Sequence, residues 1–185
     1  MSHAVVVGAG ITGLAAAWAL IRRGWTAEVL EAGPIPNPEA ASADAHRLIR
    51  SHYAGQPGYA ARIPEAFAAW EALWRDLGAR HYVPRGILAL SRKAGDWTER
   101  AGEALAAAGQ PHEVLGANEA AARFPTFEMA GVRFALFTEG GGALLADRIL
   151  AGLRGWLTAQ GTVLRPHRAA TGVDPAAGRV ETAAG

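Results

Sequence analysis

A glycine-rich turn near the amino terminus constrains the fold more than any other feature of the sequence. The apolar run Ala4–Val7 leads directly into Gly8–Gly13, which reads Gly-Ala-Gly-Ile-Thr-Gly. The run predicts a strand buried on both faces, because it is β-branched and uninterrupted. Leu14–Arg23 predicts a helix that stops at Gly24, and Ala27–Leu30 predicts a second strand. The order strand, tight turn, helix, strand is that of a βαβ unit.

Each glycine of the turn has a mechanical reason to be there. Gly8 permits the tight turn, Gly10 lets the backbone approach a pyrophosphate without a Cβ, and Gly13 lets the helix pack closely on the strand. The free N–H groups at the helix start and the helix dipole favour a phosphate. Glu31 closes the second strand, where a carboxylate can accept hydrogen bonds from ribose hydroxyls. The pattern predicts a Rossmann-type dinucleotide-binding unit, and the glycines alone do not choose between FAD and NAD.

Charge and composition exclude several classes of function. The formal net charge is +1, so no nucleic acid or other polyanionic partner is implied. The chain has no cysteine, which excludes disulfides, thiolate metal sites and a cysteine nucleophile within it. The histidines show no metal-ligand spacing, so we expect no metal. The uncharged stretch Ala4–Ile21 is interrupted by glycines, which disfavours a membrane span and leads us to expect a cytoplasmic protein.

Hydrophobic periodicity predicts further helices and strands along the chain. Tyr59–Leu77 is an amphipathic helix, with Pro64 expected in its first turn. Asn118 is expected to cap a short helix that ends at Arg123, and Gly140–Gly142 is expected to be a turn. The other expected elements are helices at Asp96–Ala108 and Ala146–Gln160, strands at His81–Arg92, Val132–Thr138 and Val163–Arg165, and a hairpin of Ala169–Val173 with Arg179–Thr182.

The longer pattern GAGITGLAAAWALIRRGWTAEVLEAG is similar to the flavoprotein version of the dinucleotide-binding unit. Beyond it, the sequence resembles the monomeric sarcosine oxidase and N-methyltryptophan oxidase group of the D-amino-acid oxidase superfamily. The stretches that carry the resemblance are the glycine turn, Ser42–Arg50 followed by His52 and Tyr53, Arg85–Leu88, and Glu139–Leu144.

The resemblance implies an α/β protein in which a Rossmann-type FAD-binding domain is interleaved with a mixed-sheet substrate domain. Residues 1–80 would be the first segment of the FAD-binding domain, 81–138 a segment of the substrate domain, and 139–185 a second, truncated segment of the FAD-binding domain. The resemblance implies a protein roughly twice this length. We therefore expect both domains to be incomplete here and a carboxy-terminal remainder of the same protein to follow.

The resemblance also implies an enzyme that oxidises a secondary amine or amino acid, sarcosine-like and bearing a carboxylate, by hydride transfer to FAD. Arg47 would lie near the flavin ring and Arg50 would bind the substrate carboxylate, so these two are the expected catalytic residues. A guanidinium suits this role because it binds a carboxylate with two parallel hydrogen bonds and stays charged when buried. The residues expected to bind FAD are Gly8, Gly10, Ile11, Thr12, Gly13, Glu31, Ala32, Ser42 and Arg47.

The sequence departs from the group in ways that leave the chemistry open. Ala43, Asp44 and Ala45 stand where the group usually has His, Gly and Asp, which leaves the exact substrate open. The group's oxygen-activating lysine and flavin-linking cysteine lie beyond residue 185, so oxidase and dehydrogenase both remain possible. The alternatives are an NAD(P)-dependent Rossmann dehydrogenase and a non-catalytic nucleotide-binding fragment. The isolated segment is expected to be poorly soluble, inactive and weak in binding flavin.

Overall fold

The computed structural model describes residues 2–54 and 56–183, and the chain divides into two compact units. Unit 1 takes in residues up to 47, residues 74–81 and residues from 145 on; unit 2 takes in residues 48–73 and 82–144. Each unit is therefore built from segments that are far apart in the sequence. The assignment of 1–80, 81–138 and 139–185 to flavin and substrate domains stays a prediction.

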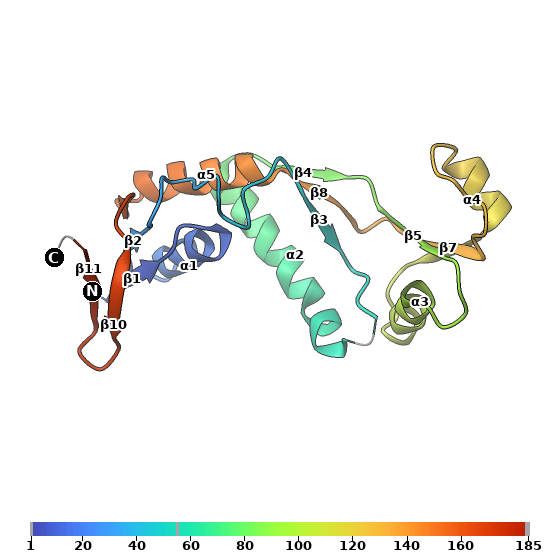
Figure 1. The fold of residues 1–185 in the computed structure, drawn as a ribbon, viewed down its shortest axis with the longest axis horizontal. Helices are drawn as coiled ribbons and strands as arrows, with labels where there is room; N and C mark the ends of the chain where they lie inside the picture. Colours follow the sequence, from blue (N-terminus) through green and yellow to red (C-terminus); the bar gives the residue numbers. More distant parts are fainter. Residues whose placement is uncertain (1, 55, 184–185) are drawn as a thin grey trace. The chain divides into compact units, whose positions relative to one another are not determined.

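Unit 1 is built on a three-stranded parallel sheet with the strand order β1-β2-β9, of which Figure 1 labels β1 and β2. Its elements are β1 (His3–Val7), α1 (Ile11–Ile21), β2 (Thr26–Leu30), α5 (Ala146–Ala159), β9 (Val163–Arg165) and the antiparallel hairpin of β10 (Ala170–Asp174) with β11 (Arg179–Thr182). The strand, turn, helix and strand predicted from the glycine motif are thus confirmed, and so is the carboxy-terminal hairpin.

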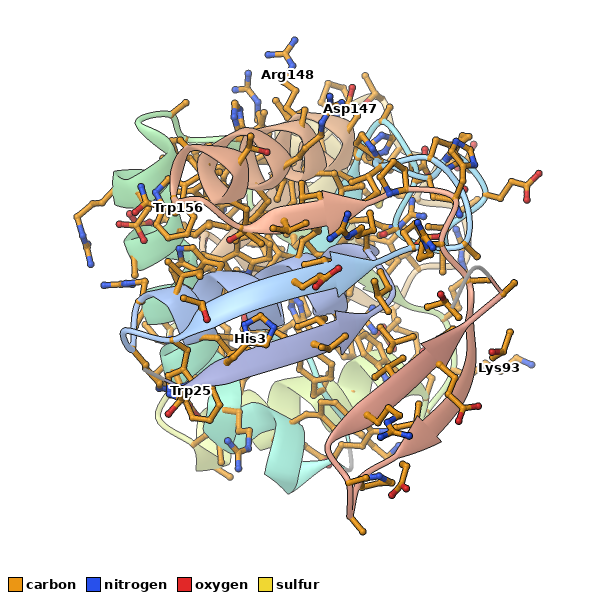
Figure 2. All side chains as sticks on the ribbon, turned by 90° about the vertical axis from the view of Figure 1, so that its left-hand side faces the viewer. His3, Trp25, Lys93, Asp147, Arg148 and Trp156 are labelled. Atoms are coloured by element: carbon orange, nitrogen blue, oxygen red, sulfur yellow. The ribbon has the colours of Figure 1, made fainter. Side chains whose placement is uncertain are left out.

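The core of unit 1 lies on one face of this sheet. Leu14 and Ala17 of α1, Val29 of β2 and Leu153 of α5 are all buried, and α1 contacts both β1 and α5. On the other face of β1, Val5 and Val7 are 38% and 52% exposed. Figure 2 looks toward the open face, with the strands in front. The expectation that this run is buried on both faces is therefore wrong for the described residues, because the packed helices lie on one face.

Unit 2 contains two three-stranded sheets, ordered β3-β8-β4 and β5-β7-β6. Its elements are β3 (Arg47–Arg50, which begins in unit 1), α2 (Pro57–Leu77, which ends in unit 1), β4 (Tyr82–Pro84), β5 (Ile87–Ser91), α3 (Trp97–Ala107), β6 (Glu113–Gly116), α4 (Ala117–Arg123), β7 (Phe134–Thr138) and β8 (Gly141–Leu144). Alternate side chains of β7 enter separate clusters: Ala135 and Phe137 pack with Ala120 of α4, while Leu136 packs with Leu105 of α3. Both faces of this strand are therefore covered.

The run Gly140–Gly142 is not a turn, because its last two residues begin strand β8. A Cβ on Gly142 would lie 2.1 Å from the carbonyl oxygen of Val83, and one on Gly141 would lie 2.5 Å from Cγ1 of Ile87. The φ angles of Gly141 and Gly142 are also positive, at +146° and +149° respectively. Their missing side chains let three strands approach closely, which the local sequence could not distinguish from a turn.

Other boundaries also differ from expectation. Helix α2 begins at Pro57, so Pro64 lies inside it rather than in its first turn. Gly116, not Asn118, is the N-cap residue of α4. The segment His81–Arg92 forms two strands, and strands β3 and β6 were not predicted. The helices α3 and α5 lie where the periodicity predicts them.

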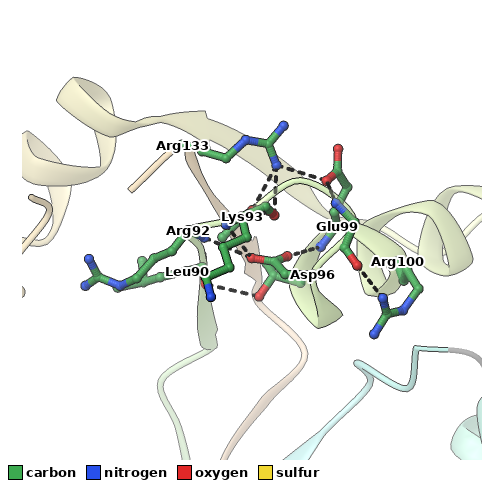
Figure 3. A network of polar contacts seen from close by, with 10 residues as sticks. Leu90, Arg92, Lys93, Asp96, Glu99, Arg100 and Arg133 are labelled. Carbon is green, nitrogen blue, oxygen red and sulfur yellow. Dashed lines mark hydrogen bonds and ion pairs between the residues drawn. The ribbon is translucent and has the colours of Figure 1, made fainter. Parts of the chain in front are cut away.

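The amino terminus of α3 is fixed by a polar network (Figure 3). The Asp96 carboxylate accepts hydrogen bonds from the backbone N–H groups of Arg92, Lys93 and Glu99 at 2.9, 3.2 and 3.0 Å. Glu99 in turn accepts one from Arg133 at 2.9 Å. The hydrogen bond from the Glu99 N–H is the largest influence on the pKa of Asp96 and lowers it. Desolvation raises this pKa, but the three N–H groups together outweigh it and hold the pKa well below its usual value.

Replacing Asp96 with Ala should lower Tm by a few degrees, because three backbone donors at the start of α3 lose their acceptor. A carboxylate with a depressed pKa contributes stability above its ordinary pKa of 3.8 that is lost as the pH falls through the folded value. The effect should therefore be full at pH 7. Thermal melts of Asp96→Ala and of Glu103→Ala, an exposed residue of the same helix, give the comparison. Equal melting temperatures would contradict the capping role.

Candidate functional site

The glycine turn connects β1 to α1, and at Gly13 it leaves no room for a side chain. Gly8 has φ +96°, and its N–H donates to the carbonyl of Leu30 at 2.7 Å, which ties the turn to β2. Gly10 is the N-cap residue of α1 and has extended backbone angles. A Cβ on Gly13 would lie 1.8 Å from the Gly8 carbonyl oxygen. The first turn of α1 therefore packs directly on the strand.

The start of α1 presents hydrogen-bond donors. The N–H of Ile11 donates to Oγ of Ser42 at 3.2 Å. The N–H groups of Thr12 and Gly13 have no acceptor among residues 2–54 and 56–183, as is normal in the first turn of a helix. A Cβ on Gly10 would meet only Ser42 Oγ, at 3.6 Å. Open donors, the positive end of the helix dipole and an absent side chain together suit a phosphate group.

The carboxylate of Glu31 is buried at the end of β2. It accepts hydrogen bonds from the N–H of Ala9 at 2.7 Å, the N–H of Gly33 at 3.0 Å and Nδ2 of Asn37 at 3.0 Å. Burial raises the pKa of Glu31, but these hydrogen bonds outweigh burial and hold the pKa below its usual value. Glu31 is therefore an anion at neutral pH. A carboxylate has about four acceptor positions, so capacity remains for a hydroxyl donor.

A segment far along the chain supports Glu31 from the other side. The N–H of Glu31 donates to the carbonyl of Arg165 at 3.0 Å, and the N–H of Arg168 donates to the carbonyl of Glu31 at 2.7 Å. His167, with φ 55°, donates its N–H to the carbonyl of Gly33 at 2.9 Å. These contacts were not predicted, since no local signal in the sequence links residues so far apart. The contact of Asn37, six residues from Glu31, was also missed.

Arg47 is exposed and closes the loop that precedes it. Its guanidinium forms an ion pair with Asp44 and donates to the carbonyl of Ala41 at 2.7 Å and to that of His46 at 3.1 Å. The hydrogen bond from Arg47 is the main reason why the pKa of Asp44 lies below its usual value. This pairing organises residues 41–47, and a position of Arg47 near a flavin ring stays a prediction.

Arg50 is half-buried in unit 2 and stacks against aromatic rings. Its Cζ lies 5.0 Å from the centre of the Trp97 ring and 5.5 Å from that of Tyr53. No carboxylate pairs with it in the described part of the chain. Cation–π contacts hold a guanidinium in place without using up its charge, so Arg50 can bind an external anion. The role of Trp97 was not predicted, because its periodicity only suggests an ordinary helical residue.

The expected residues thus divide between the two units. Arg50 belongs to unit 2, and unit 1 holds the others: Gly8, Gly10, Ile11, Thr12, Gly13, Glu31, Ala32, Ser42 and Arg47. Ala32 is exposed directly after Glu31. Within the described ranges, no helix is both long and apolar enough to cross a membrane. The cytoplasmic location stays a prediction.

Comparison with known proteins identifies the family. The profile of the family described as "DAO: FAD dependent oxidoreductase" matches residues 3–185. Monomeric sarcosine oxidase of Streptomyces avermitilis is 30% identical over 92% of this chain and 44% of its own length. Mouse (Mus musculus) peroxisomal sarcosine oxidase is 28% identical over 82% of this chain and 38% of its own length. The chain therefore spans less than half the length of these curated relatives.

Solved structures agree at the level of the fold. L-proline dehydrogenase from P. horikoshii superimposes with a TM-score of 0.84 over all of this chain and 50% of its own, at 20% identity. NikD, an unusual amino acid oxidase of nikkomycin biosynthesis, does so with a TM-score of 0.76 over 92% of this chain and 45% of its own, at 24% identity. The predicted α/β fold is confirmed, and with the profile match these findings place the chain in the FAD dependent oxidoreductase family.

Proposed function

We propose that this chain is part of an enzyme that uses FAD to oxidise the carbon–nitrogen bond of a small amine or amino acid bearing a carboxylate. The observation that carries the proposal is the junction of β1 with α1, where open backbone donors and the absent side chain of Gly10 lie beside Ser42. The family match favours FAD over the NAD(P) alternative.

The residues of unit 1 fit the ADP half of FAD. The N–H groups of Thr12 and Gly13 would bind the diphosphate, and no Cβ on Gly10 would obstruct it. Glu31, held as an anion, would accept a hydrogen bond from a ribose hydroxyl. The flavin would supply the redox chemistry as a hydride acceptor, and the protein would position its partner.

Arg50 would bind and orient the substrate. Its guanidinium is uncompensated among the described residues and is held over Trp97, so a substrate carboxylate would be its first anionic partner. A bidentate contact would fix the direction of the amine-bearing carbon. The relatives are named for sarcosine, amino acids and L-proline, all of which carry a carboxylate next to an amine-bearing carbon. This common chemistry supports the assignment.

The test is whether the protein binds FAD and passes electrons to it. The full-length protein that contains this chain, purified and mixed with FAD, should retain yellow colour after gel filtration. Anaerobic addition of sarcosine, glycine or L-proline, each tested separately, should bleach the flavin absorbance with at least one of them, while NAD⁺ leaves the spectrum unchanged. A protein that stays colourless with FAD would contradict the proposal.

Replacing Glu31 with Gln should weaken FAD binding by roughly tenfold, because one charge-assisted hydrogen bond to the ribose becomes a neutral one. The amide also turns its NH2 group toward the N–H of either Ala9 or Gly33, which then loses its acceptor, so Tm should fall as well. Fluorescence titration with FAD measures the affinity. Glu28→Gln on the same strand, where the carboxylate pairs with Arg165, should keep the wild-type affinity.

A further inference from the structure

His52 is a buried polar side chain without a partner. It is completely shielded from solvent, and neither Nδ1 nor Nε2 makes a hydrogen bond within residues 2–54 and 56–183. Buried polar groups are almost always hydrogen-bonded, so each exception calls for an explanation. His52 lies in unit 2 and is not part of the candidate dinucleotide site.

The surroundings of His52 are shared with Arg50. Its ring centre lies 6.3 Å from that of Trp97, and the Arg50 guanidinium lies 5.0 Å from the same Trp97 ring. The titratable groups whose charges act on His52 are Arg50 on β3 and His112 in the segment before β6. Helix α3 contributes the neutral Trp97. The local field is therefore positive, and no carboxylate among the described residues balances it.

This environment keeps the imidazole neutral when nothing is bound. Burial is the largest cause, followed by the charges of Arg50 and then His112, and together they lower the pKa of His52 to about 4. A histidine with a depressed pKa binds fewer protons in the folded than in the unfolded protein. Stability is thus unaffected by His52 above its ordinary pKa of 6.5 and falls as the pH drops from there toward 4.

We propose that His52 is the second cationic group of the anion site at Arg50, and that it takes up one proton from solvent when a small monocarboxylate binds there. The proposal rests on the proposed role of Arg50 in substrate binding. A carboxylate on Arg50 offsets the positive field that opposes a charge on His52, so the bound anion favours the imidazolium. By linkage, protonation of His52 strengthens binding of the anion to the same degree. Carboxylate affinity therefore rises as the pH falls.

The main experiment measures anion affinity against pH in the purified full-length protein with FAD bound. Trifluoroacetate is the probe, since it stays ionised throughout, and trifluoroacetamide is the neutral control. Calorimetry between pH 7.5 and 5.5 should show affinity rising with falling pH, by up to about tenfold per unit where linkage is full. Buffers of different ionisation enthalpy should reveal proton uptake on binding. Affinity that does not change with pH would overturn the proposal.

Variants assign the proton to His52. His52→Phe keeps a ring in the core and should bind trifluoroacetate at pH 7.5 while losing the rise at lower pH. His112→Asn should keep the rise, which separates the two histidines. If His52→Phe does not fold, proton uptake on binding is measured in the wild-type protein and in His112→Asn. Equal uptake in both assigns the proton to His52 and not to His112. A rise that persists in His52→Phe would contradict the assignment.

A ligand-independent measurement separates this proposal from the proposed function. NMR titration of the imidazole should show the pKa of His52 rising in Arg50→Gln, and rising less in His112→Asn, because the charge of Arg50 is the larger of the two. An unchanged pKa in Arg50→Gln contradicts the coupling itself. If the wild-type protein does not bind trifluoroacetate, the role of Arg50 in substrate binding is contradicted. Binding without pH dependence contradicts only the role of His52.

Discussion

Replacing Gly13 with Ala should destabilise the protein by about 3 kcal/mol or more, a large share of the stability of an ordinary domain. The new methyl group would lie 1.8 Å from the Gly8 carbonyl oxygen and 2.9 Å from its carbon. Neither is a flexible side chain, so α1 and β1 would have to move apart. Because Leu14 and Ala17 pack in the core through that same face, the separation would also disturb the packing of α1. Thermal melts should show Tm lowered by roughly 10 °C.

Gly10→Ala is the matched control, because its expected effect is on the cofactor and not on the fold. Gly10 has φ −68° and ψ −179°, which alanine adopts without strain. Its methyl group would meet only Ser42 Oγ, at an ordinary contact distance of 3.6 Å. Tm without FAD should fall only slightly, because alanine is a weaker N-cap residue than glycine, while FAD affinity should fall because the methyl group occupies the approach of the diphosphate. Wild-type stability of Gly13→Ala would refute the close packing of α1 on the glycine turn. Wild-type FAD affinity of Gly10→Ala would refute the role of Gly10 in binding the diphosphate.

The glycine turn could be predicted from sequence because its causes are local. Gly8, Gly10 and Gly13 act within one strand–helix junction, and Glu31 is positioned by the strand that follows. Gly142 shows the opposite case. Its missing side chain makes room for the carbonyl of Val83, which belongs to a strand far away in the sequence. A run of glycines indicates that side chains would not fit at these positions. Only the tertiary structure shows whether the reason is a tight turn or a neighbouring strand.

The same distinction separates what was found at the candidate site from what was missed. The resemblance singled out Arg50, but the aromatic ring that holds its guanidinium comes from Trp97, which the capping residue Asp96 places at the start of α3. His52 gave no signal of its own, because a histidine in a sequence does not show whether its nitrogens will find partners. Burial and missing partners are tertiary properties, so they appear only once Trp97 of α3 lies beside His52 and Arg50.

Replacing Arg50 with Gln should lower kcat/KM for a carboxylate-bearing substrate by about 100-fold. Two charge-assisted hydrogen bonds to the carboxylate are lost, which corresponds to about 3 kcal/mol of transition-state binding. Arg50→Lys should recover only part of this, because an ammonium keeps the charge but not the planar fork. Arg62→Gln, on the exposed surface of α2 in the same unit, should be unchanged. Steady-state kinetics with the FAD-loaded protein provides the measurement.

A substrate pair shows whether the loss belongs to the carboxylate. Sarcosine and its amide differ in charge but keep the same amine and the same carbon–hydrogen bond. If Arg50 binds the carboxylate, the wild-type enzyme should prefer sarcosine strongly, and Arg50→Gln should lose most of that preference by losing activity on sarcosine alone. An equal loss on both substrates would mean that Arg50 supports the unit through Trp97 and Tyr53 and does not bind the substrate. The cation–π contacts should then be lost with the guanidinium, and Tm would fall together with activity.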